Sequence, residues 1–277
     1  MGVVDNIRKQ AKSNGTKIQS SDEAKLEKMF NKAFYLPHNV EEEVKFVNMV
    51  MTRGLETQER SGLHASSILA SEKSFCEREQ VLSLLYKQLQ GKQIQAGLMR
   101  IFEQGNAIHE KWQRLFIRAG WSSWDELDFT QYSHRYMMSF TPDIICSIPS
   151  FYDGKMIGEI KSVNTYQFKK MERHPSAWKQ CQWYMYLTGI TKGFVLSEDK
   201  NTQDFKIELY DYDKKIVAPW IERAEQVVYD YYKLIDKHKL VKRPTDATDS
   251  NCKRCKECAM RDACWNVGMG RVRLDQQ

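Results

Sequence analysis

The stretch KMIGEIKSV, residues Lys155 to Val163, decides the fold. It is mostly apolar and short, which predicts a β-strand. Successive side chains of a strand point to opposite faces, so Glu159 and Lys161 share one face while Ile160 points to the other. Taken alone, a carboxylate two residues from an ammonium is typical of a surface ion pair. The neighbouring sequence favours a chemical role.

A second strand is predicted just upstream, within RYMMSFTPDIICSI (residues 135–148), with a turn at PSFYDG. The resulting hairpin would place Asp143, near the middle of the first strand, beside Glu159. Two carboxylates so close repel each other unless a cation lies between them. Mg²⁺ suits such a site because it takes one or two carboxylates and keeps several waters. Lys161 could then orient or deprotonate a metal-bound water.

Two helices flank this hairpin in the sequence. The stretch GNAIHEKW places Gly105 one turn before His109, on a predicted helix with an apolar face of Ile108, Trp112, Leu115 and Ala119. A lone histidine on a helix is usually structural.

The other helix, AWKQCQWYMYLTG, carries Gln180 and Tyr184 one turn apart, and Gly189 could cap it. Two more strands are predicted at KGFVLS and DFKIELYDY. A long helix then follows, with Pro219 near its first turn.

The order of these motifs is specific. G-x-x-x-H on a helix, P-D on a strand, E-x-K on the next strand and Q-x-x-x-Y on a helix resembles the PD-(D/E)xK nucleases. More closely, the order resembles the RecB-like branch, which includes AddB nucleases, CRISPR-associated exonucleases and many phage recombination nucleases. The resemblance covers Ser66 to Trp265. It implies an α/β fold with a restriction-endonuclease-like core, a small mixed sheet flanked by helices.

The resemblance also implies roles for individual residues. His109, Asp143 and Glu159, with the backbone carbonyl of Ile160, would bind Mg²⁺ or Mn²⁺. Lys161 would be the catalytic lysine. Gln180 and Tyr184 would support the active site near the DNA strand. Gln182 and Tyr186 have the same spacing, so the register of this last pair stays open, and "SFT" precedes Pro142 where the family often has a glycine.

Four of the seven cysteines lie in CKRCKECAMRDAC, residues 252–264. This spacing favours a metal centre in a reducing compartment over disulfides. Zinc usually prefers two separated pairs of ligands, whereas C-x₂-C-x₂-C is closer to runs that bind iron–sulfur clusters. By the resemblance, a 4Fe-4S cluster would be held by Cys76, Cys255, Cys258 and Cys264. Zinc is the alternative, and Cys252 would be surplus or would replace Cys76 or Cys264 as a ligand.

Composition sets wider bounds. The 277 residues suffice for one large or two small domains, and the formal net charge of +6 suits a polyanionic partner. We expect a helical appendage at 1–60 and a nuclease domain at 61–277 that includes the cluster-binding segments near 76 and at 252–264. Cys146 and Cys181 are expected in the core. No membrane-length apolar run and no signal peptide is found, which predicts a cytoplasmic protein.

These features predict a metal-dependent deoxyribonuclease with exonuclease action on single-stranded DNA or DNA ends, in recombination, repair or phage DNA metabolism. The sequence has no GxxxxGK[ST] phosphate loop, so a helicase or recombination partner would supply the motor. A non-catalytic nucleic-acid-binding scaffold and a CRISPR-adaptation nuclease are the alternatives. The predicted phosphate contacts are Arg78, Lys169, Lys170, Lys179 and Lys200.

Overall fold

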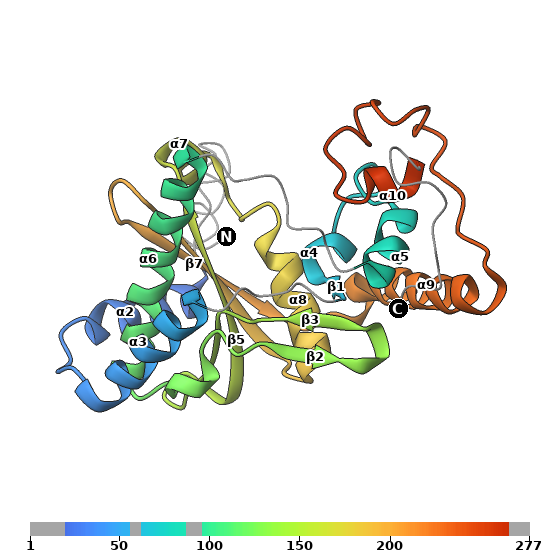
Figure 1. Cartoon of the computed structure of the whole chain (residues 1–277). Coiled ribbons are helices and arrows are strands. Elements are labelled where there is room, and N and C mark those ends of the chain that lie inside the picture. The colour runs from blue at the N-terminus through green and yellow to red at the C-terminus, as the bar shows by residue number, and fades with distance from the viewer. Residues whose placement is uncertain (1–19, 56–61, 87–95, 266–277) are drawn as a thin grey trace, which may run out of the picture.

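The structure is a computed structural model that describes residues 20–55, 62–86 and 96–265 (Figure 1). In chain order the elements are α2 (Ser21–Ala33), α3 (Val40–Leu55), β1 (Leu63–His64), α4 (Ala65–Ile68), α5 (Glu77–Leu85), α6 (Ala96–Arg118), η1 (Trp124–Glu126), β2 (Gln131–Ser133), η2 (His134–Tyr136), β3 (Met138–Phe140), β4 (Ile144–Ile148), β5 (Tyr152–Val163), α7 (Thr165–Lys170), α8 (Ala177–Thr188), β6 (Lys192–Asp199), β7 (Phe205–Asp211), α9 (Lys214–Lys237) and α10 (Arg261–Trp265).

The main sheet has four strands in the order β4-β5-β6-β7. The β4–β5 and β6–β7 pairs are antiparallel, and β5–β6 is parallel. This confirms the predicted mixed sheet flanked by helices and the hairpin around the turn at 149–151. The expected first strand is divided, however. Residues 138–140 pair in a separate sheet of order β1-β3-β2, and β4 begins only at Ile144, so Asp143 precedes the strand instead of lying in its middle.

Helices cover both faces of the main sheet (Figure 1). The segment that contains α8 joins the parallel strands β5 and β6, and α8 packs against both of them. The core on this side contains Ile157, Val195, Cys181, Trp183 and Met185. On the other side α2 and α6 pack on a core that contains Ile160, Phe194, Leu196, Trp112, Phe116 and Phe30. Cys146 and Cys181 are buried at 1% and 0% exposure, which confirms them as core residues.

Close packing between the strands requires a glycine at position 158 of KMIGEIKSV. Gly158 faces Phe194 on β6, and a Cβ at Gly158 would lie 2.4 Å from the Phe194 ring and 3.0 Å from Ile144. Any side chain there would push β5 away from its neighbours. The glycine therefore allows the strand to carry its functional residues on the opposite face while it stays closely packed.

Helix α6 is anchored to the sheet by a buried carboxylate. Glu198 on β6 is 1% exposed and accepts from Lys111 Nζ at 2.6 Å and from Trp112 Nε1 at 2.5 Å. Ile108, Trp112 and Leu115 are buried, as the apolar periodicity predicts. This contact fixes the height of α6 over the sheet and with it the position of His109 one turn earlier.

Helix boundaries differ from the predictions at two places. The cap of α2 is Ser20, whose side chain accepts from the Glu23 backbone in a capping box; the sequence suggests Ser21 or Asp22, one or two residues later. Helix α9 begins at Lys214 after an Asp213 cap, so Pro219 lies inside the helix and not in its first turn. Gly189 adopts a left-handed conformation, with φ of 74°, at the end of α8, as predicted.

The N-terminal helices share the core of the sheet. Leu26 and Phe30 of α2 are fully buried, and α2 contacts β7. In α3, Glu43 accepts from Arg114 of α6 at 3.1 Å. Residues 1–19 and 56–60 of the predicted appendage lie outside the described residues.

At the other end of the molecule α5 packs on α9 and α10 (Figure 1). None of the helices within the described ranges is long and apolar enough to span a membrane.

Candidate functional site

The two candidate carboxylates face each other across the β4–β5 hairpin. Ile144 pairs with Gly158 in the antiparallel register, so Asp143, one residue earlier, stands opposite Glu159, one residue later. Asp143 is held in place from both sides. Its Oδ2 accepts from the Ile160 backbone N–H at 2.7 Å, and its carbonyl oxygen accepts from Gln113 Nε2 at 2.9 Å. The hairpin and α6 together position this carboxylate.

Glu159 and Lys161 form a partly buried ion pair. Lys161 Nζ donates to Oε1 of Glu159 at 2.5 Å, while Oε2 is buried without a partner among the described residues. Burial, reinforced by the charge of Asp143, raises the pKa of Glu159 to about 7. Burial by itself would lower the pKa of Lys161, but the charges of Glu159 and Asp143 outweigh it and raise that pKa. The ammonium is therefore kept charged beside the carboxylates.

His109 reaches the same pair from α6. Its Nδ1 lies 3.5 Å from Oδ1 of Asp143. Burial opposes the charged form of each group, yet their mutual attraction prevails: the pKa of His109 is raised and that of Asp143 is lowered. Lys161 and the Ile160 N–H add to the lowering at Asp143. Asp143 and Glu159 thus sit side by side with their pKa values pushed apart.

Helix α8 presents Gln180 and Tyr184 to this site and turns the other pair away. Burial and the charges of Glu159 and Asp143 raise the pKa of Tyr184 well above its usual value, and Tyr184 hydrogen-bonds Gln180.

Gln182 and Tyr186, the other pair with this spacing, make hydrogen bonds elsewhere in the fold. Gln182 donates to the Asp211 carbonyl at 2.7 Å and accepts from the Asp213 N–H at 2.9 Å. Tyr186 shares a hydrogen bond of 2.5 Å with Tyr136. The geometry therefore favours Gln180 and Tyr184 as the pair near the carboxylates.

The three expected metal ligands are close but do not form a compact triad. In the described ranges, no three His, Cys, Asp or Glu side chains gather tightly enough to hold a metal ion. His109 pairs with Asp143, whereas Glu159 pairs with Lys161. The donor set nonetheless suits a hard divalent cation, because two adjacent carboxylates and an unpartnered buried oxygen of Glu159 all favour a positive charge. The contact of Ile160 with Asp143 is made by its N–H; its carbonyl role stays a prediction.

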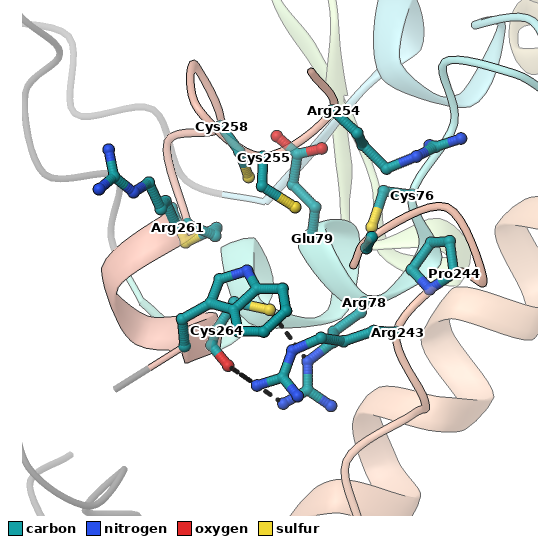
Figure 2. Close-up of a pocket in the computed structure, with 13 residues that line it drawn as sticks. Cys76, Arg78, Glu79, Arg243, Pro244, Arg254, Cys255, Cys258, Arg261 and Cys264 are labelled. Carbon is teal, nitrogen blue, oxygen red and sulfur yellow. Dashed lines mark hydrogen bonds between the residues drawn. The ribbon is translucent and has the colours of Figure 1, made fainter. Parts of the chain in front are cut away.

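The four cysteines expected to bind a cluster line one pocket, shown in Figure 2. Cys76 precedes α5 as its cap residue, and Cys255, Cys258 and Cys264 come from the C-terminal segment. Cys252 does not line this pocket. All seven cysteines are free thiols. The fold thus brings residues separated by almost two hundred positions to one place.

Arginines fasten the C-terminal segment around these thiols. Arg78 donates to Cys264 Sγ at 3.2 Å and to the Val241 carbonyl at 2.6 Å, and Arg243 donates to the Cys264 carbonyl (Figure 2). Arg254 donates to carbonyl oxygens of residues 73 and 75, just before α5, at 2.6 and 2.9 Å. The sequence interpretation of Arg78 as a phosphate contact does not fit this position, since its guanidinium is engaged within the chain.

The other expected phosphate contacts are more open. Lys169 and Lys170 are exposed in the last turn of α7, and the ammonium of Lys170 lies 4.0 Å from the Tyr166 ring centre. Lys179 and Lys200 are half-buried, in the first turn of α8 and just after β6. Their phosphate contacts stay a prediction.

Sequence reasoning missed His174, in the loop between α7 and α8. Its Nδ1 accepts from the Ala177 N–H at 3.0 Å, at the start of α8, and Lys161 is close enough to affect its pKa. The only signal in the sequence was a histidine three residues before a helix, which is too common to be informative.

Comparisons with known proteins add the following. No protein-family model and no curated protein matches the chain. Among solved structures it is similar to the alkaline exonuclease LHK-Exo of Laribacter hongkongensis, with a TM-score of 0.46, 17% identity, and coverage of 64% of this chain and 91% of that one. LHK-Exo in complex with dAMP matches with a TM-score of 0.47, 18% identity and the same coverage. The structure of SSO0001 matches with a TM-score of 0.42, 13% identity, and coverage of 79% and 91%. We argue function below from the residues of the site.

Proposed function

We propose that this protein is a metal-dependent deoxyribonuclease that hydrolyses phosphodiester bonds, with an exonuclease action on single-stranded DNA or DNA ends. The observation that carries the proposal is the Asp143–Glu159–Lys161 arrangement. Two carboxylates stand opposite each other in register on a hairpin, and an ammonium lies 2.5 Å from one of them. Burying such a group of charges costs folding free energy. Apolar residues would serve a purely structural role equally well, so the charges favour a functional role.

His109, Asp143 and Glu159 are the side chains that would hold Mg²⁺ or Mn²⁺. When bound, the ion would act as a Lewis acid on the phosphate and lower the pKa of a bound water. The protein's own groups supply the rest. Lys161 stays protonated beside the carboxylates and can stabilise negative charge that develops on the phosphate. Tyr184, held by Gln180, is kept protonated by burial and can donate its hydroxyl proton in a hydrogen bond.

We further propose that Cys76, Cys255, Cys258 and Cys264 hold a 4Fe-4S cluster, with zinc as the alternative. Four free thiols line this pocket, and their chemistry suits either group, although no three side chains of the described ranges are gathered tightly enough to hold a metal ion as they stand. Such a group would cross-link the start of α5 to the C-terminal segment. Its contribution would be structural, since it lies on the α5–α10 side of the chain, where Arg78 and Arg254 already join the same two segments.

The partner would be DNA, bound through its phosphates, and a separate helicase or recombination protein would expose the strand. Lys169 and Lys170 are exposed on α7, which begins four residues after Lys161, so they are placed to meet a strand that reaches the site. We propose a cytoplasmic location, because seven free cysteines suit a reducing compartment.

The test is cleavage by the purified protein. Single- and double-stranded DNA, labelled at either end, would be incubated with Mg²⁺, with Mn²⁺ or with a chelator. Release of short products only when metal is present supports the proposal, and the labelled end that disappears first gives the direction of digestion. Absence of cleavage of every substrate, by protein that is folded and loaded with metal, would overturn it.

A further inference from the structure

The loop between α7 and α8, residues 171–176, is fastened to the main sheet by a buried carboxylate. Glu208 on β7 is 4% exposed. Its Oε1 accepts from the His174 backbone N–H at 2.8 Å, and its Oε2 accepts from the Tyr210 hydroxyl at 2.5 Å. The hydrogen bond from the loop backbone to buried Glu208 holds the loop in place. It thereby fixes the position of His174.

The strand register places this loop beside the candidate active site. Glu159 pairs with Val195, and Val195 pairs with Glu208, so the three residues form one row across β5, β6 and β7. Residues of such a row point to the same face of the sheet. Neighbouring strands lie about 4.8 Å apart, which separates the backbones at Glu159 and Glu208 by about 10 Å. His174 therefore lies on the face that carries Glu159 and Lys161.

The ring of His174 has a defined tautomer. Its Nδ1 accepts from the backbone N–H groups of Ala177 at 3.0 Å and Ser176 at 3.4 Å, at the start of α8. A ring nitrogen that accepts a hydrogen bond carries no proton, so the proton of the neutral ring is on Nε2. Burial, with the charge of Lys161, lowers the pKa of His174 to about 4, which keeps the ring neutral at pH 7. Among the described residues, Nε2 has no hydrogen-bond partner.

We propose that the Nε2–H of His174 donates a hydrogen bond to a phosphate oxygen of the DNA strand held at Lys161. The proposal rests on the nuclease function argued above and adds a substrate-binding residue to it. A neutral donor suits this place because a second cation would repel the Lys161 ammonium. The donor is also held in one orientation before DNA arrives, so little side-chain freedom is lost on binding.

Two substitutions separate this role from the helix cap. His174→Asn keeps an acceptor near the position of Nδ1, which can still cap α8, but it lacks a donor at the position of Nε2. His174→Gln places its amide near Nε2 and loses the cap. If the ring binds phosphate, His174→Asn should lower kcat/KM on single-stranded DNA about 10- to 100-fold with an unchanged melting temperature. His174→Gln should melt earlier but keep more of the activity.

Binding should change in the same direction. In the presence of a chelator, the affinity of His174→Asn for a fluorescent oligonucleotide should fall by at least about 10-fold relative to wild type. A purely structural histidine gives the reverse pattern: His174→Asn resembles wild type in both assays and His174→Gln is the damaged variant. That result, with wild type active, would overturn the His174 proposal and leave the nuclease proposal standing. An inactive wild type would instead overturn the nuclease proposal, and this one with it.

Discussion

Substituting Glu159 by glutamine should stabilise the metal-free protein at high pH. The pKa of this carboxyl is raised from an ordinary 4.5 to about 7 by burial and by Asp143. In the unfolded chain the group loses its proton near pH 4.5, whereas in the folded chain it does so near pH 7. The folded protein therefore binds more protons between these values, and its stability falls as the pH rises through this window. Below pH 4.5 the effect is absent.

The size of the effect follows from the same numbers. Each pH unit between 4.5 and about 7 corresponds to about 1.4 kcal/mol, so the ionised carboxylate costs the fold up to about 3 kcal/mol above pH 7. Glutamine removes this cost in stability. It also leaves Lys161 without its ion-pair partner, which offsets part of the increase in stability. We expect the free energy of unfolding of Glu159→Gln to be about 1–2 kcal/mol larger than that of wild type at pH 8 with chelator, and equal to it near pH 4.5.

Urea unfolding of both proteins at several pH values measures this difference. Glu198→Gln is the matched control, since Glu198 is equally buried but both its oxygens are hydrogen-bonded. The control should lose about 1–3 kcal/mol at pH 8. Mg²⁺ at 100 times its Kd should add about 2.7 kcal/mol to wild type and less to Glu159→Gln. A variant less stable than wild type at pH 8 in chelator, or a gap that does not change with pH, would refute the reasoning.

Other predictions concern catalysis, the cysteines and DNA binding. Lys161→Ala should lower kcat by at least about 100-fold while circular dichroism is unchanged, and activity near wild type would remove it from the mechanism. Cys255→Ser should lose bound iron, or zinc, by elemental analysis, whereas Cys252→Ser, outside the pocket, should retain it; equal loss from both would contradict the ligand assignment. Charge reversal at Lys169 and Lys170 should flatten the dependence of DNA affinity on salt by about two units of slope, and an unchanged slope would exclude phosphate contacts there.

Much of the fold could be predicted because its signals are local. Alternation along residues 155–163 places Glu159 and Lys161 on one face, and the turn after residue 148 returns the chain against the preceding strand. Helical periodicity identifies the buried face of α6. These patterns depend on neighbours only a few positions apart, so no knowledge of the tertiary structure is needed.

Other features depend on contacts between distant segments. The order β4-β5-β6-β7 aligns Glu159 with Glu208, and only this alignment brings His174 to the site. Two pairs on α8 have equal spacing, and the direction in which each points is decided by what the helix packs against. Arg78 resembles any surface arginine in the sequence, because its partner Cys264 is 186 positions away.

The cleavage rate of Asp143→Asn tests the nuclease proposal most directly. Asparagine has the size of aspartate, and its Oδ1 can still accept from the Ile160 N–H, so the hairpin should fold as before. The change removes the negative charge that faces Glu159 and His109, and it replaces one acceptor oxygen by an amide NH2 group. With labelled single-stranded DNA and saturating Mg²⁺ or Mn²⁺, we expect the rate to fall at least about 100-fold below that of wild type. A rate within about two-fold of wild type would contradict a metal site at the paired carboxylates.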